Sequence, residues 1–224
     1  MRTFSHGLGG DIFPVPIPTG TTAPPAAVLF DRDGTLVVDV PYNADPEQVR
    51  PVATARAALD LLRGAGIPVG VVTNQSGIAR GLIPPAAALA VNARVNALLG
   101  PFAVWCMCPH GPDDGCACRK PRPGMVLEAA ERLGVDPRDV AVVGDIGADL
   151  AAAEAAGARS VLVPTPVTRA EEVRAAPVVR PDLLAAVRYL LGRPGPAVGE
   201  PAPAGGGWSA DPGRPDPATA GPAR

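Results

Sequence analysis

One stretch near the N-terminus decides the fold: Ala26-Ala27-Val28-Leu29-Phe30-Asp31-Arg32-Asp33-Gly34-Thr35-Leu36. An apolar run leads directly into two carboxylates that stand two positions apart. Side chains at that spacing point the same way while a strand persists, and two like charges that close are unfavourable unless a cation lies between them. The stretch therefore predicts a buried strand that ends at a divalent metal site. The alternative is a turn with acidic capping residues before Gly34.

Short β-branched runs and Ala- and Leu-rich stretches alternate along the rest of the chain. Strands are expected at 26–31, 67–73, 102–106, 140–144 and 160–163, and helices near 52–63, 84–99, 123–133, 148–156 and 181–191. The strands are apolar on both faces, as buried parallel strands are. The alternation predicts a three-layer, doubly wound α/β domain with a parallel sheet. Ligands bind beyond the C-terminal ends of such strands, so Asp31, Thr73, the cysteine cluster and Asp145 are expected in one crevice.

Glycine and proline divide the chain into three parts. The sequence of 224 residues contains 26 Gly and 29 Pro, and they are concentrated with alanine in residues 193–224. Such a segment cannot offset its ordering entropy by burial, so we expect a disordered tail there and a disordered leader over residues 1–24. Residues 25–192 are expected to form one domain, within the usual range of about 100–200 residues. The segment 36–51 is too short for a separate cap domain.

Composition excludes several classes of protein. No apolar run approaches the roughly 18–20 residues that span a bilayer, and no signal peptide is recognisable. The net charge is −2 without a basic cluster, which argues against a nucleic-acid function. We therefore expect a cytoplasmic protein that binds neither membranes nor nucleic acids, and a monomer.

Two further segments offer groups that suit a phosphate. Thr73, Asn74, Gln75 and Ser76 supply hydroxyls and amides at a strand end, where they are donors for phosphate oxygens. Taken alone, they are equally typical of a strand-end cap. Arg119 and Lys120 supply two cations just before an expected helix, and the alternative for them is a solvated basic pair.

The motif Asp31-Arg32-Asp33-Gly34-Thr35-Leu36 resembles the first motif of the haloacid dehalogenase (HAD) superfamily of aspartate-nucleophile phosphotransferases. The resemblance implies that Asp31 attacks phosphorus and that Asp33 acts first as general acid and then as general base. A carboxylate at the second position is able to protonate a leaving alkoxide and later to activate water. This ability disfavours transfer of the phosphoryl group to an acceptor other than water.

The resemblance extends to the later motifs of the superfamily. Thr73-Asn74 resembles the second motif, and the resemblance implies that Lys120 neutralises charge on the transferred phosphoryl group and that Arg119 contacts substrate. The resemblance further implies that Asp145 completes a Mg²⁺ site with the Asp31 carboxylate and the Asp33 carbonyl oxygen. We expect Asp149 to cap or orient the loop after Asp145.

Four cysteines and a histidine lie within 13 residues. In a cytosolic chain, such clustering indicates a metal site rather than disulfides, and zinc takes four Cys or His ligands. The spacing permits two sets, Cys108-His110-Cys116-Cys118 and Cys106-Cys108-Cys116-Cys118, with free thiols as a third possibility. Cys-Pro-His followed by Cys-x-Cys-Arg-Lys-Pro resembles the zinc loop of one HAD subfamily and implies the set with His110.

That subfamily also resembles the chain at Asn74-Gln75-Ser76-Gly77-Ile78-Ala79-Arg80-Gly81. It comprises the heptose bisphosphate phosphatases, with the histidinol phosphatases as close relatives. We expect a structural Zn²⁺, because four protein ligands leave no open position. Folding of the loop around this metal would hold Arg119 and Lys120 over the crevice.

The resemblance implies a Mg²⁺-dependent phosphatase that cleaves a small phosphorylated metabolite through an aspartyl-phosphate intermediate. The expected substrate is D-glycero-D-manno-heptose 1,7-bisphosphate, which loses its 7-phosphate. The expected substrate contacts are Asp39, Tyr42, Thr73, Asn74, Gln75, Ser76, Arg80, Arg119 and Lys120. Some heptose phosphatases carry Lys where this chain has Ile146, so the contact made there is missing or replaced. The alternatives are a histidinol-phosphate or other sugar-phosphate phosphatase and, in a different class, a non-catalytic zinc-loop binding module.

Overall fold

The computed structural model describes residues 23–193 of the chain. The expected disordered leader (1–24) and tail (193–224) lie almost entirely outside the described residues. Both therefore stay predictions, as do the outer limits of the expected domain at 25–192.

Within residues 23–193 the chain forms five strands, six α-helices and two 3-10 helices. The strands are β1 (Ala27–Phe30), β2 (Val69–Asn74), β3 (Val104–Cys108), β4 (Val140–Gly144) and β5 (Arg159–Leu162). The α-helices are α1 (Ala55–Gly64), α2 (Pro85–Leu99), α3 (Gly124–Leu133), α4 (Gly147–Ala156), α5 (Ala170–Ala175) and α6 (Leu183–Leu190). The 3-10 helices are η1 (Pro46–Gln48) and η2 (Pro137–Asp139). None of the helices in this part of the chain is long and apolar enough to cross a membrane.

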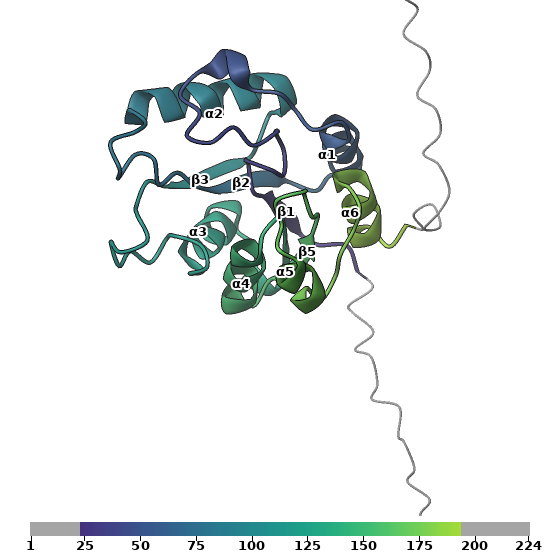
Figure 1. Ribbon diagram of the computed structural model, residues 1–224. Helices are drawn as coiled ribbons and strands as arrows, with labels where there is room; N and C mark the ends of the chain where they lie inside the picture. Colours follow the sequence, from purple (N-terminus) through teal and green to yellow (C-terminus); the bar gives the residue numbers. More distant parts are fainter. Residues whose placement is uncertain (1–22, 194–224) are drawn as a thin grey trace, which may run out of the picture. The chain divides into compact units, whose positions relative to one another are not determined.

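The strands form a single parallel sheet in the order β3-β2-β1-β4-β5. Helices α1, α2 and α6 cover one face, and α3 and α4 cover the other (Figure 1). The expected three-layer α/β fold is confirmed. The segment between β1 and α1 contains only η1, so no cap domain is inserted there and the end of β1 opens toward solvent.

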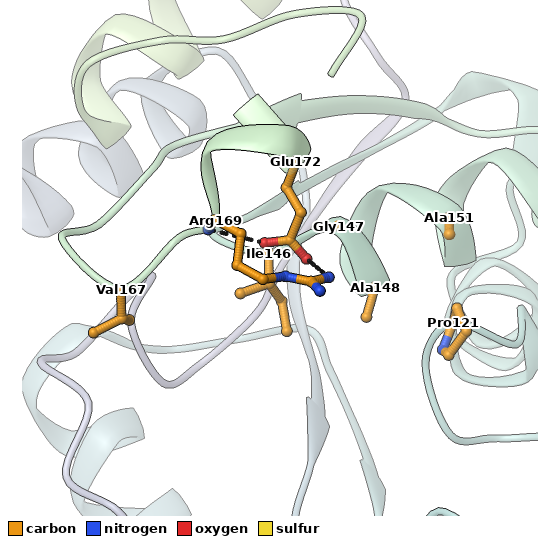
Figure 2. Close-up of a pocket in the computed structure, with 8 residues that line it drawn as sticks. All are labelled: Pro121, Ile146, Gly147, Ala148, Ala151, Val167, Arg169 and Glu172. Atoms are coloured by element: carbon orange, nitrogen blue, oxygen red, sulfur yellow. Dashed lines mark hydrogen bonds and ion pairs between the residues drawn. The ribbon is translucent and has the colours of Figure 1, made fainter. Parts of the chain in front are cut away.

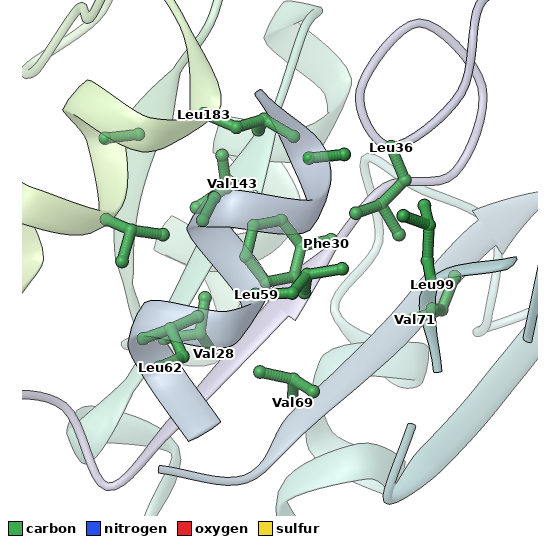
Figure 3. Packing of buried hydrophobic residues seen from close by; sticks show 14 of the residues in the cluster. Val28, Phe30, Leu36, Leu59, Leu62, Val69, Val71, Leu99, Val143 and Leu183 are labelled. Atoms are coloured by element: carbon green, nitrogen blue, oxygen red, sulfur yellow. The ribbon is translucent and has the colours of Figure 1, made fainter. Parts of the chain in front are cut away.

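Strand β1 lies at the centre of the sheet and contributes to both hydrophobic layers. Val28 and Phe30 point toward α1, α2 and α6, where they join Leu59 and Leu62 in one buried cluster (Figure 3). Ala27 and Leu29 point to the other face, where they join a second buried cluster with residues of α3 and α4. Each fully buried Leu or Phe contributes about 1.5–3 kcal/mol relative to an exposed one. The four-residue apolar run thus anchors the strand that delivers Asp31.

The bounds of most observed elements differ from the sequence expectation by one to three residues, and three differences have a clear structural reason. Strand β2 begins at Val69 rather than at position 67, because the Ile67 amide donates to Leu62 O and ends helix α1. Strand β3 begins at Val104 rather than at 102 and extends to Cys108 rather than to 106, because its pairing with β2 runs from Val104 to Cys108. Helix α5 was not predicted, since it is short and contains no buried residue.

Candidate active site

A crevice of about 350 Å³ lies at the C-terminal ends of the central strands. The register of the sheet explains its position: Phe30 pairs with Val143, and the Asp31 amide donates to Val143 O at 3.0 Å. The chains leaving β1 and β4 are therefore neighbours. The lining residues are Asp31, Arg32, Asp33, Asp39, Val40, Pro41, Tyr42, Asn43, Thr73, Asn74, Gln75, Ser76, Gly77, Ile83, Lys120, Asp145, Ile146 and Val167.

Asp31, Asp145 and Lys120 line the crevice, and with the fully buried Asp149 they form a cluster of three carboxylates and one ammonium. Lys120 Nζ lies 2.6 Å from Asp31 Oδ1 and 2.6 Å from Asp149 Oδ1. Ligand atoms of Asp31, Asp145 and Asp149 lie within 4.8 Å of one another. When all four groups are ionised, their formal charges sum to −2, which a divalent cation balances. The donor set, carboxylates in a restricted space, also suits Mg²⁺.

Two carboxylates of this cluster have raised pKa values in the absence of a cation. Burial raises the pKa of Asp31 well above its usual range, with Lys120 opposing the rise and Asp149 and Asp33 adding to it. Burial and the neighbouring Asp149 raise the pKa of Asp145 to about 7. Burial alone would lower the pKa of Lys120, but the charges of Asp149 and Asp31 outweigh it and raise that pKa. Lys120 therefore stays a cation, and the cluster favours an additional positive charge.

The side chain of Asp33 lies in a frame of donors beside this cluster. Arg32 Nη2 lies 2.8 Å and Arg32 Nε 3.1 Å from Asp33 Oδ2, and Nε is also 3.0 Å from Oδ1. Gln75 Nε2 donates to the same Oδ2 at 2.8 Å and lies 2.9 Å from Thr73 Oγ1. The Asp33 side chain is 25% exposed, so it reaches both the protein frame and the open crevice.

Asn74 ties the end of β2 to the segment that carries Lys120. Its Nδ2 donates to Lys120 O at 3.1 Å, and its Oδ1 accepts from the Lys120 amide at 3.1 Å. The Lys120 ammonium also donates to Val72 O at 2.8 Å. Asn74 lines the crevice as the sequence predicted, but both ends of its side chain are engaged with the Lys120 main chain.

The structure brings together four of the five soft ligand candidates. Cys108 Sγ lies 3.7 Å from Cys116 Sγ, 3.2 Å from Cys118 Sγ and 3.5 Å from His110 Nδ1, and that nitrogen lies 3.3 Å from Cys118 Sγ. Ligands at the corners of a tetrahedron with Zn–S distances of about 2.3 Å would be separated by roughly 3.5–3.8 Å. The four groups therefore fit a zinc ion.

Cys106 does not belong to this group. It is buried in the hydrophobic cluster beside α3, and its Sγ lies 3.9 Å from Arg132 Nη1. Burial raises the pKa of the Cys106 thiol to about 11, with Glu128 adding to the rise. Of the two ligand sets that the spacing permits, the geometry favours the one with His110.

The remaining predicted substrate contacts fall into two groups. Asp39, Tyr42 and Ser76 line the crevice, and burial and the nearby Asp33 raise the pKa of Asp39. Arg80 and Arg119 do not line it. Arg80 Nη1 donates to the hydroxyl oxygen of Tyr42 at 2.8 Å, and Arg119 Nη1 donates to His110 O at 3.2 Å.

A second hollow of about 610 Å³ adjoins the crevice and shares Ile146 and Val167 with it. Figure 2 shows Ile146 just before α4, beside the ion pair of Arg169 and Glu172, and Val167 on the loop that precedes α5. Arg169, the cation of this hollow, is already paired with Glu172 at 2.7 Å. The hollow therefore gives the crevice an apolar flank rather than a second anion site.

Sequence reasoning missed two buried residues of the site and understated a third. Arg32 stands between the two catalytic candidates, and a cation inside an acidic motif is the signal that marks it. Asn92 is a polar residue on the buried side of α2, between Val91 and Val95. Asp149 was expected only to orient a loop, and it does accept from the Ile146 amide at 3.2 Å, but it also pairs with Lys120.

Comparison with known proteins adds independent findings. A family model described as HAD-hydrolase-like matches residues 117–187. The D-glycero-beta-D-manno-heptose-1,7-bisphosphate 7-phosphatase of Pseudomonas aeruginosa is 42% identical over 143 residues, which are 62% of this chain and 80% of that protein. The enzyme of the same name from Vibrio cholerae is 35% identical over 179 residues, covering 74% of this chain and 96% of that protein.

Solved structures give the same result. The crystal structure of D,D-heptose 1,7-bisphosphate phosphatase from B. bronchiseptica, complexed with magnesium and phosphate, aligns with a TM-score of 0.66 at 35% identity. The alignment covers 74% of this chain and 98% of that one. This chain therefore belongs to the HAD superfamily and, within it, to the family of the heptose-1,7-bisphosphate 7-phosphatases, and it is a phosphatase.

Proposed function

We propose that this phosphatase removes the 7-phosphate from D-glycero-D-manno-heptose 1,7-bisphosphate in a Mg²⁺-dependent reaction. The buried cluster of Asp31, Asp145, Asp149 and Lys120 carries the proposal, because its charge and donors fit one divalent cation and its nucleophile faces an open crevice. The substrate is taken from the names of relatives that are up to 44% identical.

The metal would be held by the carboxylates of Asp31 and Asp145 and by the main-chain oxygen of Asp33. When bound, Mg²⁺ would neutralise phosphate charge and favour the ionised nucleophile. Lys120 supplies a second positive charge, and the Thr73 hydroxyl supplies a neutral donor at the end of β2. Phosphoryl transfer depends mainly on such positioning and charge stabilisation.

The chain's own residues account for both chemical steps. Asp31 attacks phosphorus while the bond from phosphorus to the sugar oxygen breaks, and Asp33 gives its proton to that oxygen. Asp33 then takes a proton from water as the water oxygen attacks phosphorus and the Asp31–phosphorus bond breaks. The products are inorganic phosphate and the heptose 1-phosphate, and the cycle leaves Asp31 as a carboxylate and Asp33 again carrying its proton.

A structural Zn²⁺ in the loop of Cys108, His110, Cys116 and Cys118 would support Lys120. Cys118 stands two residues before Lys120, so a metal that fixes Cys118 restricts the lysine. Asn74 would contribute in the same direction through its two hydrogen bonds to the Lys120 main chain.

A phosphate-release screen tests the proposed substrate. Both anomers of the heptose 1,7-bisphosphate, histidinol phosphate and common sugar phosphates are compared with and without Mg²⁺, and ³¹P NMR identifies the phosphate that leaves. The highest kcat/KM is expected for a heptose bisphosphate, with loss of the 7-phosphate and no turnover by Asp31→Asn. Preference for histidinol phosphate or another monophosphate would overturn the substrate and keep the phosphatase. Full activity of Asp31→Asn would overturn the mechanism.

A further inference from the structure

Arg32 is the largest of the fully buried side chains in the described part of the chain, with 1% of the residue exposed. Its guanidinium donates hydrogen bonds to two different side chains, those of Asp33 and Asn92. Nε and Nη2 donate to the Asp33 carboxylate, and Nη1 donates to Asn92 Oδ1 at 2.5 Å. Among residues 23–193, Asp33 is the acidic residue that forms an ion pair with it, at 2.8 Å.

Asn92 connects this contact to helix α2. It is 9% exposed and lies on the helix face that carries Val91 and Val95 into the core. Its Nδ2 lies 3.6 Å from Met107 Sδ of β3, so both ends of the amide are in contact with other side chains. A buried Asn with these neighbours has a defined orientation, and it fixes the far end of the guanidinium.

Stability alone gives little reason for a charged pair at this place. Replacement of a buried ion pair by well-packed apolar side chains is often neutral or stabilising by about 1–4 kcal/mol. The Arg32–Asp33 contact is bidentate, and a planar guanidinium that binds a carboxylate in this way fixes its orientation as well as its charge. The carboxylate so held is the one that the proposed reaction uses for proton transfer.

We infer that Arg32 and Asn92 are positioning residues for the proton transfers of Asp33. Asn92 orients Arg32, and Arg32 orients Asp33 toward the leaving oxygen and then toward the attacking water. The inference rests on the proposed function, since it needs an aspartyl-phosphate at Asp31 that Asp33 helps to form and to hydrolyse. Gln75, which donates to Asp33 from the other strand at 2.8 Å, completes the frame.

The test uses two substrates that differ in their need for a general acid. Nitrophenolate leaves p-nitrophenyl phosphate without being protonated, whereas the sugar oxygen of the heptose bisphosphate needs a proton. Hydrolysis of the aspartyl-phosphate needs Asp33 as base with either substrate. Asn92→Ala and Arg32→Met are therefore expected to release one nitrophenolate per active site in a rapid burst, followed by slow turnover. On the heptose bisphosphate, kcat should fall about 10- to 100-fold, less than the roughly 100- to 10,000-fold that general acid–base catalysis supplies because Asp33 itself is still present, with little change in KM.

Three further variants make the result specific. Asn96→Ala is the matched control, because Asn96 stands on the same helix and accepts from the Phe102 amide rather than from Arg32, so its kinetics should equal those of the unmodified enzyme. Asn92→Ser keeps an oxygen acceptor and should retain more activity than Asn92→Ala. If Arg32→Met does not fold, the comparison of Asn92→Ala with Asn92→Ser tests the positioning role. Asp33→Asn gives the size of the burst that is expected when the general base is lost completely.

The outcomes separate the two levels of inference. Asp33→Asn with full activity would refute the proposed mechanism itself. A burst in Asp33→Asn but none in folded Asn92→Ala or Arg32→Met would refute the positioning role and keep the mechanism. Equal losses on both substrates without a burst, together with a lowered melting temperature, would show that Arg32 and Asn92 serve stability alone.

Discussion

The conformation of Gly34 and the position of Asp145 depend on one another. Gly34 has a φ of +78°, and a Cβ placed on it would overlap Asp145 Oδ2. The residue after the acidic pair therefore has to be glycine for two separate reasons, the left-handed backbone and the close approach of a carboxylate.

Gly34→Ala should displace Asp145 and weaken Mg²⁺ binding by at least about tenfold, which corresponds to about 1.4 kcal/mol. Titration of activity with Mg²⁺ measures the effect. Gly81→Ala is the matched control, since Gly81 has a φ of +67° with open space around its Cβ. The control should lower only the free energy of unfolding, by about 1–2 kcal/mol. Equal Mg²⁺ affinities in the two variants would contradict the role assigned to the contact.

The buried carboxylates also predict a pH dependence of stability. The folded, Mg²⁺-free protein holds the pKa of Asp145 at about 7, and of Asp31 well above its usual range, against an ordinary value of 3.8. Between these values the folded state binds more protons than the unfolded state, so the free energy of unfolding falls as pH rises. Mg²⁺ requires the ionised carboxylates, so the rise in melting temperature on adding Mg²⁺ should be larger at pH 8 than at pH 5. Asp145→Asn should reduce that difference, and a Mg²⁺ effect that is constant with pH would contradict the assignment.

At the scale of elements, the end of β3 and the loop between β3 and α3 carry both the proposed zinc ligands and Lys120. Cys116→Ser should lower the zinc content and the melting temperature, and should weaken the binding of inorganic phosphate, because Lys120 loses its anchor two residues after Cys118. Metal analysis and competitive inhibition by phosphate measure these effects. Cys106→Ala should retain one zinc ion per chain with unchanged phosphate affinity, since Cys106 lies in the core beside Arg132. Unchanged kinetics in a zinc-free Cys116→Ser protein would show that metal binding in the loop does not position Lys120.

Asn74 offers a second test of the same link without altering a metal ligand. Asn74→Ala removes both hydrogen bonds to the Lys120 main chain, so kcat should fall about tenfold or more while zinc content stays the same. Steady-state kinetics and metal analysis on one preparation give both values. A rise in KM with kcat unchanged would instead assign Asn74 to substrate binding.

The elements that the sequence predicted are those with strong local signals. The apolar runs of β1, β2 and β4 are buried on both faces, and the motif that ends the first of them leads straight into the crevice. Helix α5 has no such signal because none of its residues is buried. The contact between Arg32 and Asn92 joins residues 60 positions apart, and its partners follow from the packing of α2 on the sheet. Local patterns therefore locate the acidic residues, and tertiary contacts decide what orients them.

At the scale of the molecule, residues 23–193 contain every predicted site residue and both hydrophobic clusters. A protein consisting of these residues alone should fold and keep kcat/KM within about twofold, because none of the groups in the proposed mechanism lies outside it. Thermal unfolding and phosphate release compare it with the full chain. A tenfold loss of activity in a folded fragment would assign a function to residues 1–22 or 194–224.

The order of the strands has a consequence for the molecule as it is made. β4 lies beside β1 in the sheet, yet Asp145 follows Thr35, its hydrogen-bond partner, by 110 positions. Asp31, Thr73 and Lys120 are therefore synthesised well before Asp145, the carboxylate that completes the cluster. A truncated chain that lacks β4 would leave the phosphorylated metabolites around it intact, so phosphatase activity requires a chain that extends through β4 and Asp145.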